Sequence, residues 1–418
     1  MRFIHAADIH LDSPLTGLSA YADAPVEMLR TATRDAFTNL VTLAIDERVD
    51  FMVIAGDLYD GNWKDYNTGL YFVKEMGRLD KAGIPVFLLH GNHDAESEMT
   101  RKLLLPDNVS VFDSRKPSSF RLDHLGVVLH GRSFKDAATL ENLATTYPDA
   151  VSGLINIGVL HTALEGNAMH ANYAPCSLAE LHAKGYEYWA LGHVHEYAMW
   201  RGDSVIVFPG NLQGRHIRET GPRGAVLVEC NAAGEMEVQR VYVDVLRWHR
   251  LEVDASASST FEEVARTIGG ALENLLEAAA ANIPLAVRVI VGGRTAAHGE
   301  LFGMEAQLRQ EVLASIAALG SDRIWLEKVR LETIPMDDGQ ALRQRADALA
   351  DLQDVLIGAE NDPEFLDALR NDLSALLNKA PLELRSSVPY FDDIKTGDLA
   401  ALLREIRPSL VAHLAKGD

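Results

Sequence analysis

The chain has 418 residues, of which 47% are hydrophobic and 24% charged, and its formal net charge is −21 at pH 7. This length predicts two or three domains, and so acidic a surface excludes binding of nucleic acid by bulk electrostatic attraction alone. The sequence lacks an apolar run near the roughly 20 residues of a membrane helix, and its first ten residues do not resemble a signal peptide. Its two cysteines, Cys176 and Cys230, are too few for a disulfide framework or a thiolate zinc site, so we expect a cytoplasmic protein.

The first hundred residues alternate between short apolar runs and longer helical patterns, which is typical of an α/β domain. Strands are expected at 1–10, 50–57 and 84–94, with helices at 25–49 and 65–83 between them. Seven more apolar runs follow with little helical pattern between them, at 108–112, 126–133, 155–162, 186–195, 204–211, 224–230 and 236–245. So many strands predict an α/β fold with a two-sheet core flanked by helices, in a first domain over residues 1–245.

The pattern changes near residue 245. Strand patterns at 248–254, 285–293 and 323–333 alternate with helical patterns at 260–281 and 304–319. They predict a small α+β domain over residues 246–335. Residues 336–418 carry Leu-rich and Ala-rich helical patterns, interrupted at 378–393 by prolines that a helix interior does not tolerate. We therefore expect a separate helical region at the end of the chain.

Five polar clusters each lie at or just beyond the end of an apolar strand run. They contain Asp8, His10, Asp57, Asp60, Asn92, His93, Asp94, His161, His193 and His195. Because residues two apart in a strand point to the same side, Asp8 with His10, and His193 with His195, can each aim two ligands at one point. Carboxylates, imidazoles and an amide oxygen suit manganese, iron or zinc. The set is too large for one ion and predicts a site for two.

A two-ion site suits in-line displacement at phosphorus, because the ions activate a water and neutralise charge on the phosphate. Asp57 has two oxygens with which to bridge the ions. The leaving alkoxide must gain a proton, and His93 is the candidate acid, with Asp94 to orient its ring and favour its protonated form. The candidates for contacts to substrate phosphates are Arg215, His216 and Arg218. Three basic residues in a loop, however, often only face water.

Each cluster taken alone also has a purely structural interpretation. His161 at the end of an apolar strand could be a hydrogen-bonded core residue, Asp57 could cap a turn, and Asp60 could be a solvated loop carboxylate. Chance alone, however, would not place five such clusters at matching ends of strands. The combination favours the metal site.

In their order along the chain, the motifs D-x-H, G-D, G-N-H-D, H and G-H-x-H resemble those of the calcineurin-like metallophosphoesterase superfamily. The resemblance covers about the first 240 residues. Within it, FIHAADIHLDSPLTGL, GDLYDG, HGNHD and FPGNLQGRH look like the DNA-repair exonuclease branch, which includes the SbcD-like nucleases and the YhaO-type proteins. The resemblance implies an α-β-β-α core, with a capping domain after residue 245.

The resemblance also implies roles for individual residues. One divalent ion, most often Mn²⁺, would be held by Asp8, His10, Asp57 and His195, and a second by Asp57, Asn92, His161 and His193. His93 would be the catalytic acid and Asp94 its partner. The implied activity is a 3′ to 5′ exonuclease or a structure-selective endonuclease acting on DNA in repair. Its implied partner is an SMC-like, SbcC-type ATPase, for which the helices after residue 336 are candidate docking elements, and a homodimer is a further possibility.

One position departs from this branch. Break-repair nucleases usually have a histidine three residues after the bridging aspartate, and here that residue is Asp60. An ionised carboxylate cannot donate a hydrogen bond to a phosphate and repels it, which weakens the expectation of processive exonuclease action. Two alternatives stay open at this point, a phosphodiesterase for nucleotides or other small phosphoesters and a DNA-end-binding scaffold with little turnover.

Overall fold

The computed structural model describes residues 1–17, 26–60, 66–96, 104–164, 173–231, 233–279, 282–320, 322–336, 348–377 and 399–414. The chain forms two compact units. The first comprises Met1–His249 with Ala280–Ala286, and the second comprises Arg250–Ala279 with Val287–Asp418. Within the described residues, no helix is both long and apolar enough to cross a membrane.

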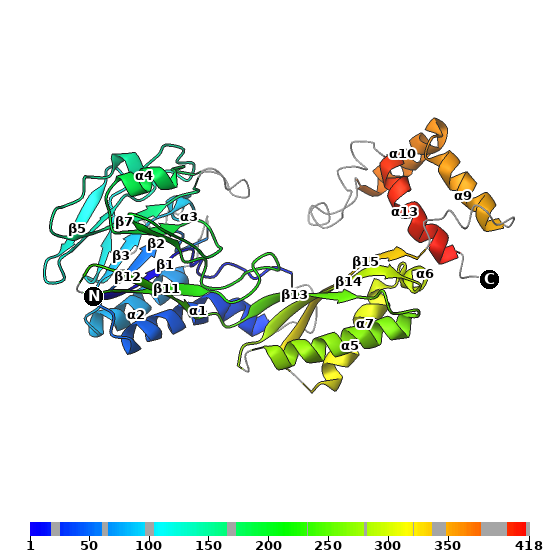
Figure 1. The fold of residues 1–418 in the computed structure, drawn as a ribbon, viewed down its shortest axis with the longest axis horizontal. Helices are drawn as coiled ribbons and strands as arrows, with labels where there is room; N and C mark the ends of the chain where they lie inside the picture. Colours follow the sequence, from blue (N-terminus) through cyan, green and yellow to red (C-terminus); the bar gives the residue numbers. More distant parts are fainter. Residues whose placement is uncertain are drawn as a thin grey trace. The chain divides into compact units, whose positions relative to one another are not determined.

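The first sheet of the larger unit has the strand order β12-β11-β1-β2-β3-β4. Its strands are β1 (Arg2–Ala6), β2 (Phe51–Ala55), β3 (Val86–Leu89), β4 (Val109–Val111), β11 (Gly224–Cys230) and β12 (Met236–Tyr242). The strands β1 to β4 are parallel, and β11 is antiparallel to both of its neighbours. Helices α1 (Val26–Asp46) and α2 (Tyr66–Lys81) connect the first three strands and cover one face of the sheet (Figure 1). Phe37 and Phe72 on these helices are fully buried against that face.

The second sheet has the order β5-β6-β7-β8-β10-β9. Its strands are β5 (Ser118–Leu122), β6 (Val127–Gly131), β7 (Ile155–His161), β8 (Tyr188–Gly192), β9 (Ala198–Arg201) and β10 (Val205–Phe208). The two sheets bury a shared core that includes Phe3 and Phe51 from the first and Tyr188 from the second. The outer face of the second sheet packs under α4 (Leu178–Ala183), where Trp189 is fully buried. This arrangement confirms the predicted two-sheet α/β core.

The ends of the central strands meet at one edge of this core. β1, β2 and β3 are aligned so that Ala6 pairs with Ile54, and Ala55 with Leu89. In the second sheet, His161 at the end of β7 pairs with Gly192 at the end of β8. Parallel α/β sheets bind ligands outside the carboxyl ends of their strands. All five polar clusters follow these strand ends or lie on them.

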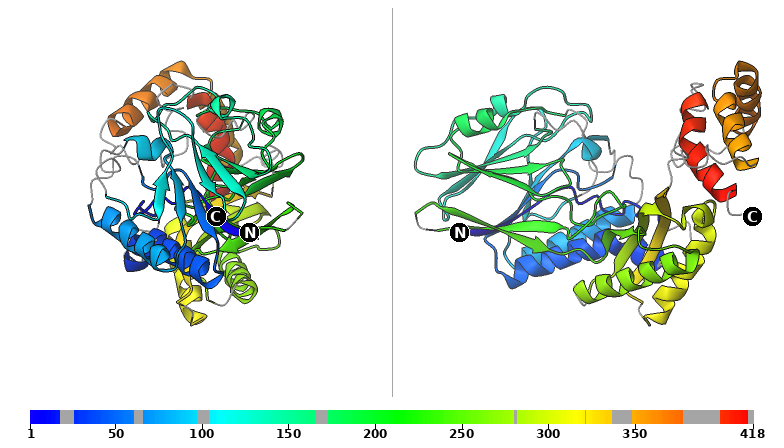
Figure 2. Two further views of the ribbon diagram at one scale, coloured as in Figure 1. Left: turned by 90° about the vertical axis from the view of Figure 1, so that its left-hand side faces the viewer. Right: turned by 45° about the vertical axis from the view of Figure 1, so that its right-hand side comes forward.

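The second unit contains most of a three-stranded sheet in the order β13-β14-β15. The elements are β13 (Arg247–Asp254), α5 (Phe261–Ala278), β14 (Leu285–Thr295), α6 (His298–Leu301), α7 (Glu305–Ala318), β15 (Ile324–Pro335), α9 (Ala348–Ala359), α10 (Pro363–Leu377) and α13 (Leu399–Leu414). Helices α5 and α7 pack together (Figure 2), and α13 contacts both α6 and β15. The proline-interrupted segment 378–393 lies outside the described residues, and the division at residue 335 into a cap and a separate helical region stays a prediction.

Candidate metal centre

The first group of candidate ligands joins the loop after β1 to the loop after β8. One ligand atom from each of Asp8, His10 and His195 lies within 4.8 Å of the others. The Nε2 atoms of His10 and His195 are 3.2 Å apart, and Nε2 of His195 is 4.0 Å from Oδ1 of Asp8. Two imidazole lone pairs repel each other at this separation unless a proton or a cation lies between them. The geometry therefore fits a cation.

The second group joins the loop after β2 to β7 and the end of β8. Asp57, His161 and His193 form it, are all buried, and again place their ligand atoms within 4.8 Å of one another. Nε2 of His161 is 3.3 Å from Oδ2 of Asp57 and 3.0 Å from the side-chain oxygen of Asn92. Nitrogen and oxygen donors converge here as a divalent transition metal requires.

The backbone at these ligands is strained. Asp8, His10, Asp57 and His193 have φ values of 50°, 46°, 51° and 101°, in the left-handed region that residues with a Cβ seldom occupy. Such outliers concentrate at functional sites, where the surrounding structure holds them. The strain indicates that the fold maintains this ligand geometry at an energetic cost.

Two glycines make room for the ligands. A Cβ on Gly56, whose φ is 100°, would lie 2.3 Å from Nδ1 of His161, and a Cβ on Gly91 would lie 2.3 Å from Oδ1 of Asp57. Neither glycine could therefore carry a side chain without displacing a ligand. Glycine is thus required for a steric reason at both positions.

Hydrogen bonds fix the orientation of two of the imidazoles. Nδ1 of His161 is 3.0 Å from the carbonyl oxygen of Ala55, and Nδ1 of His195 is 2.7 Å from Oε1 of Glu219. In a neutral ring with its proton on Nδ1, the lone pair of Nε2 would be directed at the ligand group, and such partners also raise the basicity of a metal ligand. Sequence reasoning missed Glu219, although it is the only acidic residue in the basic segment 214–223.

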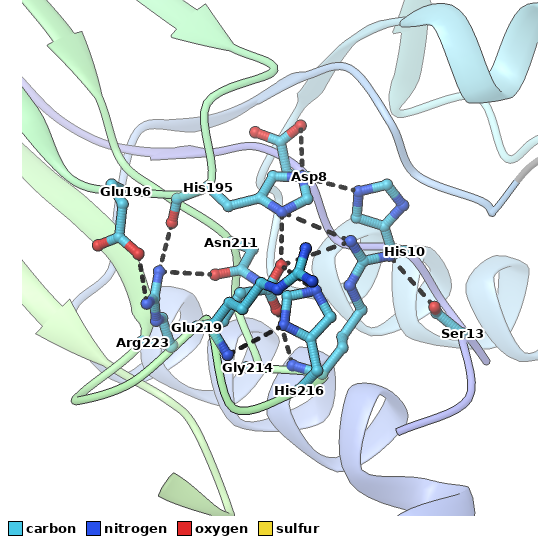
Figure 3. A network of polar contacts seen from close by, with 12 residues as sticks. Asp8, His10, Ser13, His195, Glu196, Asn211, Gly214, His216, Glu219 and Arg223 are labelled. Carbon is cyan, nitrogen blue, oxygen red and sulfur yellow. Dashed lines mark hydrogen bonds and ion pairs between the residues drawn. The ribbon is translucent and has the colours of Figure 1, made fainter. Parts of the chain in front are cut away.

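Glu219 lies at the centre of a buried network (Figure 3). Its Oε2 accepts hydrogen bonds from the backbone nitrogen of Arg215 at 2.7 Å and from Nδ2 of Asn211 at 3.0 Å. Burial would raise the pKa of its carboxyl group, but the hydrogen bond from His195 and the charge of Arg215 hold that pKa well below its usual range. Glu219 is therefore ionised at neutral pH. Arg223 supports the loop after β8 by donating a hydrogen bond to the carbonyl oxygen of His195 at 2.5 Å.

Burial and neighbouring charges shift the pKa values of four candidate ligands. Burial lowers the pKa of His10 to about 3 and raises that of Asp8 to about 6. Burial opposes the charges of His161 and Asp57 as well, but their mutual attraction prevails. It raises the pKa of His161 to about 9 and holds that of Asp57 well below its usual range. His161 therefore carries the positive charge that an ion beside Asp57 would replace.

His93 and Asp94 are not arranged as predicted. They lie in α3 (Asn92–Glu96), where consecutive side chains diverge. The Asp94 carboxylate accepts hydrogen bonds from the backbone nitrogens of Leu58, Tyr59 and Gly91. It thereby ties the loop after β2 to the start of α3. The carboxylate paired with the His93 ring is that of Asp60, with Nδ1 and Oδ1 3.3 Å apart.

The three predicted phosphate-binding residues have different surroundings. The Arg215 side chain is only 14% exposed, and its guanidinium group contacts Ser13, Asp60 and Glu219. Nε2 of His216 is 3.7 Å from the Glu219 carboxylate. Arg218 is exposed. Arg215 thus braces the loop beside His195, and contacts of the three residues to a substrate phosphate stay a prediction.

Comparisons with known proteins agree with this geometry. Residues 1–197 match the family described as calcineurin-like phosphoesterase, and residues 248–334 match the middle domain of metallophosphoesterase YhaO. The uncharacterized metallophosphoesterase YhaO of Bacillus subtilis is 30% identical over 382 residues, which cover 87% of this chain and 91% of that protein.

More distant relatives are DNA double-strand break repair proteins called Mre11. The protein from Sulfurisphaera tokodaii is 24% identical over 58% of this chain and 63% of its own length. The protein from Methanopyrus kandleri is 26% identical over 64% of this chain and 62% of its own length. The similarity thus spans somewhat less than two thirds of each of these repair proteins.

Proposed function

The chain belongs to the calcineurin-like metallophosphoesterase family, whose members hydrolyse phosphoester bonds, and we propose that it cleaves phosphodiester bonds in DNA. The observation that carries this proposal is the pair of ligand groups at one edge of the core, with His93 beside them. The DNA substrate is supported by the similarity to the two Mre11 repair proteins. We further propose that this cleavage is exonuclease or structure-selective endonuclease action in DNA repair.

Seven side chains would hold two divalent ions, for which Mn²⁺ is our proposal. Asp8, His10 and His195 would hold one ion, Asn92, His161 and His193 the other, and Asp57 both. Ions so held supply an activated water and stabilise the charge of the phosphate during in-line displacement. The protein would fix the ligand positions through the left-handed backbone at the ligands, the hydrogen bond from His161 to the carbonyl oxygen of Ala55 and that from His195 to Glu219.

His93 is the group that would protonate the leaving alkoxide. Its ring centroid lies 5.0 Å from that of the candidate ligand His10, while its side chain is 38% exposed. Its backbone nitrogen donates to Oδ1 of Asp57 at 3.0 Å, which fixes the residue beside the ligands. A histidine next to the reacting centre but accessible to substrate suits general acid catalysis.

A partner would supply the positive surface that a chain of net charge −21 lacks. We propose an SMC-like ATPase as this partner and the helices α9, α10 and α13 as its docking elements. These helices expose large apolar side chains, with Val355 65%, Phe365 44% and Ile406 39% accessible. Single exposed apolar residues are common on proteins, so the three together support docking only in combination with the family relationship.

The test is cleavage by the purified full chain in Mn²⁺ or in chelator, on linear duplex DNA and on bis-p-nitrophenyl phosphate. We expect metal-dependent cleavage of both substrates. His93→Ala should retain the bound ions but lose about 10²-fold to 10⁴-fold in turnover on DNA. His124→Ala, which changes an exposed histidine of the same unit, is the matched control and should act like the wild type.

Other outcomes would select the alternatives. Cleavage of the small ester alone would favour a phosphodiesterase for nucleotides or small phosphoesters, or a nuclease that requires its partner. Failure on both substrates would favour a DNA-end-binding scaffold. A His93→Ala protein as fast as the wild type on DNA would remove the acid role assigned to His93.

A further inference from the structure

The Asp60 carboxylate lies between two imidazoles of the candidate site. Its Oδ1 is 3.3 Å from Nδ1 of His93 and 3.5 Å from Nδ1 of His10. His10 belongs to the first ligand group, and His10, Asp60 and His93 form a third group whose ligand atoms also lie within 4.8 Å of one another. In the proposed function His93 is the acid rather than a ligand. Oδ1 of Asp60 thus faces both the candidate ligand His10 and the candidate acid His93.

Two further residues hold this carboxylate in place. The hydroxyl group of Ser13 donates to Oδ2 of Asp60 at 2.8 Å, and a guanidinium nitrogen of Arg215 lies 3.8 Å from Oδ1. The same nitrogen donates to the Ser13 hydroxyl oxygen at 3.2 Å, so the three side chains form a closed triangle. The Asp60 side chain is 29% exposed and is therefore neither a fully solvated loop carboxylate nor an unpaired one.

The His10 ring needs an acceptor on the side that faces Asp60. Its Nε2 faces Nε2 of His195, while its buried Nδ1 has no hydrogen-bond partner within the described part of the chain. Nδ1 of His10 and Oδ1 of Asp60 are 3.5 Å apart, which is an ion-pair distance. A small rotation of either side chain would convert this contact into a hydrogen bond. A proton held on Nδ1 would leave the Nε2 lone pair free for a cation.

We infer that Asp60 is a positioning residue that orients both His10 and His93 by accepting from Nδ1 of each ring. This inference rests on the proposed function, because it assigns Nε2 of His10 to metal binding and Nε2 of His93 to proton transfer. It also gives Asp60 a different part from the phosphate-contacting histidine of the break-repair nucleases. The carboxylate acts behind His93 and is screened by Arg215, so it need not meet the phosphate.

The inference predicts two separable effects of Asp60→Ala. Without an orienting carboxylate, His10 should bind Mn²⁺ at least about 10-fold more weakly, the usual effect of losing an outer partner of a metal ligand. At saturating Mn²⁺, turnover should fall by about 10²-fold on a DNA oligonucleotide, whose leaving alkoxide needs a proton. On bis-p-nitrophenyl phosphate the fall should be small, because nitrophenolate leaves without one.

Three measurements on the full chain test this. Calorimetry gives the Mn²⁺ affinity, steady-state kinetics give kcat on the two substrates, and long-range ¹H–¹⁵N spectra of the metal-free, ¹⁵N-histidine-labelled protein report which ring nitrogen of His93 and His10 carries the proton. Asp60→Asn retains an acceptor oxygen and should recover at least about 10-fold of the lost turnover on DNA. Asp80→Ala, an exposed aspartate on α2, is the matched control.

The outcomes separate this inference from the proposed function. Three results for Asp60→Ala would each overturn the positioning role. They are an equal loss of turnover on both substrates, a loss of metal affinity alone, and behaviour like that of Asp80→Ala. A wild-type protein that does not cleave DNA would instead count against the proposed function. If the wild type cleaves neither substrate, the spectra and the Mn²⁺ affinity still decide. A proton on Nδ1 of both rings, displaced in Asp60→Ala with weaker Mn²⁺ binding, supports the inference, and unchanged spectra refute it.

Discussion

Replacing Glu219 by glutamine should weaken metal binding without touching a metal ligand. The two oxygens of Glu219 accept from three donors: Oε1 from Nδ1 of His195, and Oε2 from the backbone nitrogen of Arg215 and from Nδ2 of Asn211. Glutamine has one oxygen and one NH₂ group. If its oxygen keeps the two donors at Oε2, the NH₂ group faces His195 and forces the proton of that ring onto Nε2.

The size of the effect follows from this geometry. A proton on Nε2 of His195 occupies the nitrogen that faces His10 at 3.2 Å and must be displaced by the ion. If the amide turns the other way, two buried donors lose their acceptor. Loss of an outer partner of a metal-ligating histidine weakens binding by about 10-fold to 100-fold, or about 1.4 to 2.8 kcal/mol. We expect this loss for the ion held by Asp8, His10 and His195.

Calorimetric titration of the metal-free protein with Mn²⁺ measures the change. One of two binding steps should weaken in Glu219→Gln, while the step assigned to Asp57, His161 and His193 stays within about twofold of the wild type. Glu237→Gln, which alters an exposed glutamate on β12, controls for the change in net charge. Wild-type affinity at both steps in a folded Glu219→Gln protein would refute the role given to Glu219.

The remaining predictions concern the glycine beside Asp57, a second glycine in open space and the charge of His161. Gly91→Ala would place a Cβ 2.3 Å from Oδ1 of Asp57 and should weaken binding of both ions by at least about 10-fold. Gly77→Ala, in open space within α2, should stabilise the protein by about 0.5–1 kcal/mol in urea titrations. Normal Mn²⁺ stoichiometry and affinity in Gly91→Ala would contradict the steric argument. His161, with its pKa raised from 6.5 to about 9, contributes stability that is complete below pH 6.5 and lost as the pH rises through 9. Mn²⁺ binding at pH 7.5 should therefore release about one proton from His161, and at pH 10 almost none. Titrations in buffers of different ionisation enthalpy measure this, and equal release at both pH values would count against the raised pKa.

The convergence of the candidate ligands could be predicted from the sequence because each lies at or just beyond the end of a strand whose apolar pattern is unambiguous. The parallel order of β1, β2 and β3 brought Asp57 and Asn92 to the same edge. This relation depends on backbone geometry, which residue patterns encode well.

The expectation from strand alternation was wrong, because β1 ends at Ala6 and β8 at Gly192. Asp8 and His10 meet through left-handed backbone beyond the strand, and His193 and His195 fall into different ligand groups.

The partners of the ligands could not be read in the same way. Glu219 is 24 residues from His195, and Asp60 is 33 residues from His93, so neither pair forms a local motif. The proximity of His93 and Asp94 in the sequence suggested a pair that the helical turn of α3 separates. Contacts between loops depend on how the loops pack, and that is decided by the whole fold.

The left-handed backbone at the candidate ligands explains why these residues follow the strand ends so closely in the sequence. A side chain that follows a buried strand directly can turn back across the sheet edge if its residue adopts a left-handed conformation, as Asp8, Asp57 and His193 do. Aspartate and histidine tolerate that conformation better than most residues with a Cβ, and glycine at position 56 supplies the turn before Asp57. The residue types proposed to bind the ions are thus also among those that the tight turns accept. Sequence motifs at such sites therefore record a backbone requirement as well as a chemical one.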